Sequence, residues 1–274
     1  MDANRFNQIL VVDSVPTGEL NTAKRLFADL KTHAAGYSPC PAIRYLRVES
    51  GDELIQCILQ CRIDAYEQDV IPMLHIECHG DDDGFQLADG SLVDWAELKL
   101  PITGLNVATR LNLLIAVAAC SGGALAKMIT MSDRAPFWGL IGPTGALPAG
   151  ELERAYSALY LTLLSSKTPA KAVEAMDAAT KPGLLWRTTS QGLFESAWAG
   201  YKKQYCSPDA LEIRAKRMRQ QLEQQSYEPL PTVEELKTRL LDHEPTAFER
   251  FRATYFMYEL FPEHSSRFPV KYVK

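Results

Sequence analysis

The sequence has no apolar run approaching the roughly 20 residues that a membrane-spanning helix needs. Its first residues, Met1-Asp2-Ala3-Asn4-Arg5, lack the apolar core of a secretory signal. Positive charge is not in excess either: the formal net charge of -5 disfavours a nucleic-acid partner, because duplex binding usually rests on a basic surface. These absences predict a cytoplasmic protein with no membrane segment and no nucleic-acid partner.

Cysteine is too irregularly spaced for a disulfide framework, and a reducing compartment would keep the thiols free. The six cysteines are Cys40, Cys57, Cys61, Cys78, Cys120 and Cys206. Most of them fit the description of small buried hydrophobic residues. Cys120 fits it badly, because Ser121-Gly122-Gly123 follows it.

What the sequence does contain is apolar runs that alternate with segments of helical periodicity. We expect strands at 8–13, 43–48, 71–78, 112–119, 137–141 and 184–189. We expect helices at 52–66, 124–131, 151–164 and 168–179, and helical spacing of apolar residues also recurs over 20–30. Strands that are apolar on both faces and alternate with helices are typical of a mostly parallel sheet in a layered α/β domain.

Two further regions are expected to have other structure. Residues 85–95 are predicted to form a β-hairpin around Asp89-Gly90, followed by a partly helical linker at 96–111. From residue 193 the pattern is helical and more polar, so we divide the chain into a domain of residues 1–192 and a helical C-terminal extension, 193–274, packed on or near it. The aromatic residues of this extension are expected to pack a tail helix onto its own domain rather than bind a partner; they are Phe248, Phe251, Tyr255, Phe256, Tyr258 and Phe261.

Reactive side chains follow two consecutive strands of the predicted sheet. His79-Gly80 ends the strand at 71–78, and Cys120-Ser121 ends the strand at 112–119. In a parallel sheet the carboxyl ends of strands lie at one edge, where functional groups gather. An imidazole there can take the proton of a thiol, and backbone N–H groups of the following glycines, with that of Gly80, can bind an oxyanion. The pattern indicates nucleophilic chemistry by Cys120 with help from His79.

These motifs resemble the clan of caspases, metacaspases, separase and the bacterial CHAT peptidases, and they are most similar to CHAT-type domains. The resemblance covers about residues 5–190. It includes the His-Gly pair, the Ala-Cys-Ser-Gly-Gly run at 119–123, the hairpin of 85–95, and the closing helices at 151–164 and 168–176.

The resemblance implies a three-layer α/β/α caspase-like sandwich of about six strands and a cysteine endopeptidase that cleaves a specific protein partner. It implies His79 as general base and acid, Cys120 as the nucleophile of an acyl-enzyme, and the amides of Gly80 and Cys120 as the oxyanion donors. No metal or organic cofactor is required. In bacteria, such peptidases often belong to defence or programmed-death systems, and a second protein can act as activator.

Other candidates remain open at this stage. Asp13 ends the first strand, where this clan often reads the side chain before the scissile bond, but a turn residue explains it equally well. A carboxylate at Asp13 would favour Lys or Arg before the scissile bond. Metacaspases, however, also carry an acidic residue just before the nucleophile, and here that position is Ala119, which argues against basic specificity. Ser121, beside the nucleophile, is a second candidate for substrate contact. Glu77 could orient His79 or pair with another buried group.

Two metal sites and two other functions are weaker alternatives. His75, Cys78 and His79 could form a zinc site, although strand alternation separates Cys78 from the histidines. The run Asp81–Asp83 could bind calcium, although it reads as a solvated turn. A non-catalytic caspase-fold scaffold that binds a protein is the main rival function. A nucleotide binder is disfavoured, because residues 13–18 are not a glycine-rich phosphate loop.

Overall fold

The computed structural model describes residues 5–34, 36 and 39–273, which form two compact units. The first holds the described residues up to Ile129 and Ala135–Ser190; the second holds Thr130–Arg134 and the chain from Gln191 onward. The short segment Thr130–Arg134 thus joins the C-terminal unit, which the sequence did not indicate. Within the described ranges, no helix is both long and apolar enough to cross a bilayer.

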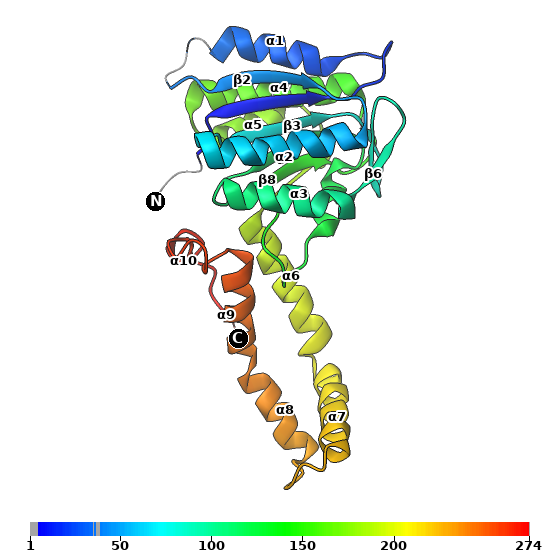
Figure 1. The fold of residues 1–274 in the computed structure, drawn as a ribbon, viewed down its shortest axis with the longest axis vertical. Helices are drawn as coiled ribbons and strands as arrows, with labels where there is room; N and C mark the ends of the chain where they lie inside the picture. Colours follow the sequence, from blue (N-terminus) through cyan, green and yellow to red (C-terminus); the bar gives the residue numbers. More distant parts are fainter. Residues whose placement is uncertain (1–4, 35, 37–38, 274) are drawn as a thin grey trace. The chain divides into compact units, whose positions relative to one another are not determined.

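A six-stranded sheet forms the centre of the first unit (Figure 1). Its order is β2-β1-β3-β7-β8-β9, and every neighbouring pair is parallel except β8 with β9. The strands are β1 Gln8–Asp13, β2 Ala42–Arg47, β3 Pro72–Glu77, β7 Leu114–Ala118, β8 Gly139–Pro143 and β9 Leu185–Thr189. The predicted mostly parallel sheet is confirmed, with each predicted strand displaced by no more than a few residues.

Helices cover both faces of this sheet, so the predicted three-layer α/β/α sandwich is also confirmed (Figure 1). One face carries α1 (Thr22–Ala34), α4 (Ala149–Ser166) and α5 (Pro169–Ala178), whose apolar side chains join those of β1 in one core cluster. The other carries α2 (Gly51–Gln68) and α3 (Trp95–Ala108). Burial of apolar side chains on both faces explains why the strands read as continuous apolar runs.

Helix α3 is more regular than the partly helical linker that the sequence predicts. It contains Pro101 and Gly104, two residue types that disfavour a helix interior. A capping box begins it: the Glu97 N–H donates to Asp94 Oδ1 at 2.8 Å, and the Asp94 N–H donates to Glu97 Oε2 at 3.0 Å. Burial of one apolar face of the helix outweighs the cost of the proline.

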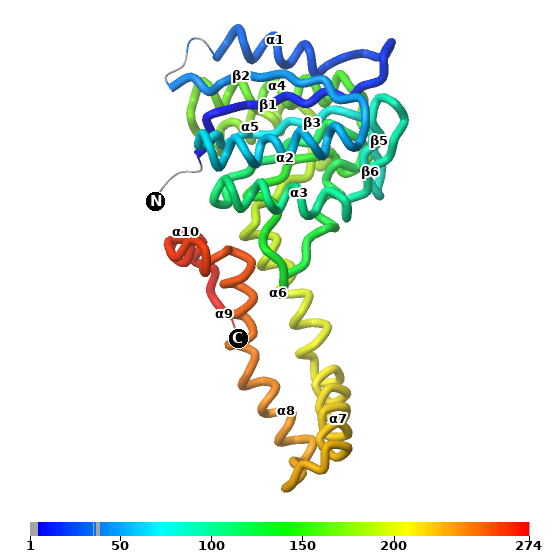
Figure 2. The backbone as a smooth tube through the Cα atoms, in the orientation of Figure 1, coloured from blue at the N-terminus to red at the C-terminus, as the bar shows by residue number. Residues whose placement is uncertain are grey.

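A second, three-stranded sheet lies beyond the carboxyl end of β3. It contains β4 (His79–Gly80), β5 (Gly84–Gln86) and β6 (Leu92–Asp94), all antiparallel. Figure 2 shows the backbone passing from β3 into this sheet and on to α3. The predicted hairpin is confirmed, since Phe85 pairs with Val93 across β5 and β6. The short helix expected at 124–131 is a 3₁₀ helix, η1 (Gly122–Met128).

The second unit is helical, as predicted for the extension. Its helices are α6 Ser190–Tyr205, α7 Pro208–Gln224, α8 Val233–Asp242, α9 Glu244–Tyr255 and α10 His264–Arg267. Phe194 of α6 packs against Phe248, Tyr255 and Phe256, with ring centroids 5.3–5.6 Å apart. These four rings are buried. These four aromatic rings therefore form a core within the C-terminal unit.

Candidate active site

The register of β3 and β7 brings the two candidate catalytic residues to the same edge of the sheet. The strands are parallel neighbours, and Glu77 is paired with Ala118 at the end of the ladder. His79 and Cys120 each stand two positions beyond that last pair. This register agrees with the prediction that the His79-Gly80 and Cys120-Ser121 segments are spatial neighbours.

Gly80 and the Ala119–Cys120 segment lie directly against each other. A Cβ atom at Gly80 would lie 3.1 Å from the Cβ of Ala119, 3.1 Å from the carbonyl oxygen of Cys120 and 3.2 Å from that of Gly84. Few side chains tolerate such distances, so a residue without Cβ allows this close approach. The His-Gly pair is thereby held beside the candidate nucleophile.

The pairing of β4 with β5 indicates on which side of the small sheet the Gly80 N–H lies. The Asp81 N–H donates to the Gly84 oxygen at 3.1 Å, which makes residues 81 and 84 a hydrogen-bonded pair of the β4–β5 ladder. Such pairs alternate in an antiparallel ladder, so Gly80, opposite Phe85, is in a non-hydrogen-bonded position. Its amide is therefore directed to the side opposite β5, as an oxyanion donor must be.

The chain turns sharply after Cys120. Ser121 adopts a left-handed backbone with φ 55°, and the Gly122 N–H donates to the Ala119 oxygen at 3.0 Å. The Ser121 N–H donates to the Gly145 oxygen at 3.2 Å. Of the two glycine amides expected to serve an oxyanion, that of Gly122 is therefore already bonded within the turn. Gly80 and Cys120 stay the proposed donors.

Gly122 is required by packing. A Cβ atom there would lie 2.4 Å from Val117 Cγ1 and 3.3 Å from Pro143 Cδ. Gly122→Ala is therefore expected to destabilise the protein by about 1–3 kcal/mol, the usual cost of overpacking. Gly145→Ala is the matched control, because a Cβ at Gly145 would meet nothing within 4 Å. Urea unfolding of both variants checks this, and equal stabilities would contradict the packing role.

Cys120 is partly exposed, whereas the neighbouring Cys78 is buried. Burial raises the pKa of the Cys78 thiol well above its ordinary value, with the nearby Glu77 carboxylate adding to the effect. A thiol of raised pKa in the interior is a poor nucleophile. Of the two cysteines at this edge, Cys120 is the one that a substrate can reach.

His79 has a partner that the sequence did not reveal. Its side chain is 47% exposed, and its Nε2 lies 3.0 Å from Glu19 Oε2 and 3.1 Å from Oε1. Glu19 belongs to the segment between β1 and α1, which also emerges at the carboxyl edge of the sheet. In the sequence, the signal for Glu19 is its place in the loop that follows β1, because this loop lies at the edge where the strands end.

Of the two roles left open for Asp13, substrate contact and turn residue, the structure favours the turn residue. Asp13 has no exposed surface, and its Oδ1 accepts hydrogen bonds from the Val15 N–H at 2.9 Å and from Arg47 Nη1 at 3.0 Å. Its Oδ2 accepts from Asn21 Nδ2 at 2.6 Å and from the Tyr45 hydroxyl. Burial, followed by this hydrogen bond, raises the pKa of Tyr45. Asp13 is therefore a buried turn residue whose charge and hydrogen bonds are satisfied within the fold.

Glu77 also serves the interior and not His79. It accepts a hydrogen bond from the Thr22 hydroxyl, and its Oε2 lies 3.6 Å from Nε2 of the buried His75. The other ring nitrogen of His75 contacts the Tyr160 hydroxyl at 3.2 Å. In the ranges 5–34, 36 and 39–273, no group of three or more His, Cys, Asp and Glu side chains is placed to hold a metal ion.

Comparison with known proteins adds a structural likeness. No protein-family model matches the chain, and no curated protein matches it. A solved structure of caspase-1 from Spodoptera frugiperda is similar to it with a TM-score of 0.44 and 14% sequence identity. The likeness covers 69% of this chain and 89% of the caspase chain. At this identity it concerns the fold alone, and it transfers no residue role to this chain.

Proposed function

We propose that the chain is a cysteine endopeptidase with Cys120 as nucleophile and His79 as the acid–base group. The observation that supports this most is the seating of Gly80 against Ala119–Cys120, because it sets the imidazole-bearing segment beside an accessible thiol. The Gly80 amide directed away from its ladder adds the third element of acyl transfer, a donor for the oxyanion.

In the proposed reaction, His79 takes the proton of the Cys120 thiol and the sulfur attacks the carbonyl carbon of the scissile peptide bond. The carbonyl oxygen becomes an anion that accepts hydrogen bonds from the amides of Gly80 and Cys120. Collapse of this intermediate breaks the C–N bond, and the protonated His79 donates its proton to the departing amine. An acyl-enzyme on Cys120 remains.

Hydrolysis repeats these steps with water. His79 removes a proton from a water molecule as the water oxygen attacks the thioester carbonyl. The C–S bond then breaks, and the Cys120 thiolate leaves and takes that proton back from His79. Glu19 acts as a positioning residue, since its carboxylate contacts the Nε2 side of the imidazole. This leaves the other nitrogen of the ring for the proton transfers.

The substrate class is a protein segment in extended conformation, recognised in a specific partner. With Asp13 compensated by Arg47, nothing at that strand end favours a basic residue before the scissile bond. Ser121 stays a candidate for substrate contact, because it is partly exposed and follows the nucleophile directly. An activating protein and a role in defence or programmed death rest on the sequence resemblance alone.

The decisive experiment measures the reactivity of each cysteine in the folded protein. A small thiol reagent, iodoacetamide, and peptide probes with Arg, Leu or Asp before the reactive group are compared by mass spectrometry. We expect Cys120 to react faster than the exposed Cys40, and the reaction to slow in His79→Ala. Cys120→Ala is expected to remove labelling by the peptide probes altogether.

The same experiment separates a peptidase from a non-catalytic scaffold. Iodoacetamide needs no substrate groove, so an enzyme awaiting an activator would still show the dependence of Cys120 on His79. Equal rates at Cys120 and Cys40, unchanged by His79→Ala, would contradict the proposal and favour the scaffold.

A further inference from the structure

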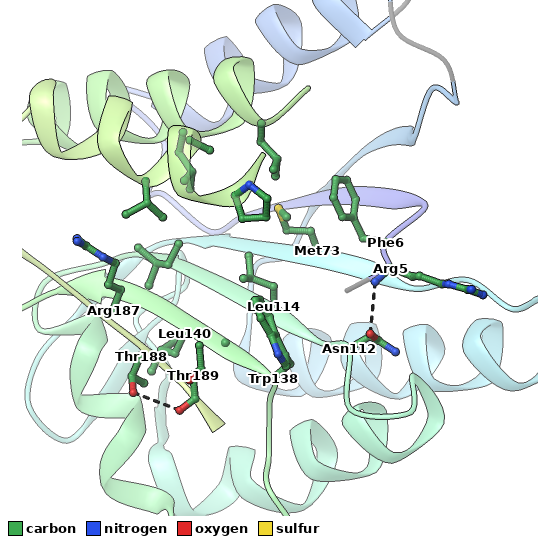
Figure 3. Close-up of a pocket in the computed structure, with 17 residues that line it drawn as sticks. Arg5, Phe6, Met73, Asn112, Leu114, Trp138, Leu140, Arg187, Thr188 and Thr189 are labelled. Atoms are coloured by element: carbon green, nitrogen blue, oxygen red, sulfur yellow. Dashed lines mark hydrogen bonds between the residues drawn. The ribbon is translucent and has the colours of Figure 1, made fainter. Parts of the chain in front are cut away.

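A cavity of about 350 Å³ lies at the other edge of the sheet from the candidate active site. Leu114 and Gly139, the first residues of β7 and β8, line it, as does Met73 near the start of β3. Figure 3 shows Leu114 of β7 and Trp138, which directly precedes β8, on one side and helix residues on the other. The cavity is thus a slot between the amino ends of the strands and helices α4 and α5.

The walls of this slot are apolar. Leu159 and Leu163 of α4 and Ala172 of α5 line it, and all three belong to the core cluster of this face. A dry apolar cavity of roughly 150 Å³ already binds a small hydrocarbon, and pockets for small molecules span about 300–1,000 Å³. A space of 350 Å³ among such side chains offers water few hydrogen bonds but suits a hydrocarbon chain.

The polar side chains of the lining lie toward the ends of the slot. Arg5 and Asn112 lie at one end in Figure 3, and Arg187 and Thr188 lie at the other, so each end carries an arginine. The Arg187 guanidinium is held by Asp177 of α5, with N–O distances of 2.7 and 2.9 Å. The carboxylate occupies two of the five donors of the guanidinium. Neither Asp nor Glu is among the residues that line the cavity.

The cavity is open to solvent on the side where its lining residues are exposed, so a ligand can enter there. Pro169, Arg187 and Thr189 are exposed at the rim, whereas Leu140 and Leu159 are buried within. A ligand that enters from this side can bury an apolar part and leave a charged end beside the guanidinium. The chemistry of the lining therefore selects one apolar chain with one anionic terminus.

We propose that this cavity binds a linear fatty carboxylate, with the acyl chain between the sheet and helices α4 and α5 and the carboxylate at Arg187. The site is separate from His79 and Cys120 and does not depend on the proposed peptidase function. Each methylene that enters such a cavity strengthens binding by about fourfold. Affinity should stop rising once the chain fills the slot.

The test measures binding of hexanoate, octanoate, decanoate and dodecanoate to the full chain, by calorimetry and by tryptophan fluorescence, below their micelle concentrations. Trp138 lines the cavity and is the expected reporter. In Trp138→Phe the fluorescence change should be lost while the heat of binding persists. Ala172→Phe, which extends a ring into the slot, should weaken decanoate binding at least tenfold; Val173→Phe serves the same purpose if the first variant fails to fold.

A matched pair of variants tests the carboxylate. Arg187→Gln and Asp177→Asn break the same ion pair, but only the first removes the cation. Arg187→Gln should weaken decanoate binding about tenfold and leave decanol binding unchanged, whereas Asp177→Asn should retain or strengthen decanoate binding. Absence of saturable binding, or wild-type affinity in both filled variants, would overturn the site. Equal binding of decanol and decanoate, unaffected by Arg187→Gln, would overturn the assignment of the anionic end.

Discussion

His79→Ala is expected to lower kcat/KM for cleavage of a peptide by about 10²–10⁴-fold, the usual contribution of a positioned acid–base group. The fall should lie mainly in kcat, because the imidazole acts in the proton transfers and not in holding the substrate. Stability should change by no more than about 0.5 kcal/mol, since the side chain is half exposed and its ion pair with Glu19 is at the surface. Steady-state kinetics on the peptide that gives the best probe, with unfolding in urea, provide the measurement.

Glu19→Gln is the graded comparison for this prediction. A glutamine keeps an oxygen in reach of His79 but removes the charge, so kcat should fall by about tenfold or less while KM stays the same. An exposed ion pair such as that of Glu19 with His79 contributes only modestly to orienting the imidazole. A His79→Ala variant that cleaves within threefold of the wild-type rate would contradict the role of His79, whatever the behaviour of Glu19→Gln.

The parts of the molecule that the sequence predicted share one property: they depend on local pattern and on the order of elements. Apolar runs alternating with helices lead directly to a parallel sheet. Once that sheet is assumed, the ends of β3 and β7 must lie at one edge, which places His79 near Cys120. The hairpin of β5 and β6 follows from an Asp-Gly turn flanked by apolar residues.

The parts that the sequence missed depend on partners far along the chain. Asp13 at the end of β1 looks like an available carboxylate until β2 is placed beside it, because Tyr45 and Arg47 both come from that strand. Glu19 lies in a loop without periodicity, so no local pattern marks its contact with His79. Such pairings follow from register and side-chain direction, which composition and spacing do not determine.

The backbone N–H groups after Cys120 are another case in which the sequence does not reveal the hydrogen-bond partners. A run of two glycines suggests accessible backbone, and the sequence alone cannot tell which N–H groups are already bonded. The turn at Ser121 engages the N–H groups of Ser121 and Gly122, which donate to the oxygens of Gly145 and Ala119. Gly122 has a structural reason for lacking a side chain, its contact with Val117, in addition to any catalytic one.

Arg47→Met is expected to destabilise the protein by about 3 kcal/mol, because it leaves a buried carboxylate without its countercharge. Asp13 is fully buried and Arg47 is 26% exposed, with 3.0 Å between Nη1 and Oδ1. Methionine keeps most of the apolar stem, so the loss reports the charge and its hydrogen bonds more than packing. The hydrogen bonds from Val15, Asn21 and Tyr45 remain and keep the cost toward the lower end for buried pairs. Urea unfolding followed by tryptophan fluorescence measures the change.

Two comparisons make this prediction specific to the buried pair. Arg25→Met removes an arginine that is 57% exposed and lies 3.5 Å from Glu153, so it should cost less than about 1 kcal/mol. The double variant Arg47→Met with Asp13→Asn should be more stable than Arg47→Met alone, because the amide carries no charge to compensate. If Arg47→Met costs no more than Arg25→Met, the hydrogen bonds from Val15, Asn21 and Tyr45 must satisfy the Asp13 carboxylate without Arg47, which would contradict the prediction. A large cost that Asp13→Asn relieves instead means that this strand end serves the fold, so that specificity for the residue before the scissile bond must come from elsewhere on the carboxyl edge.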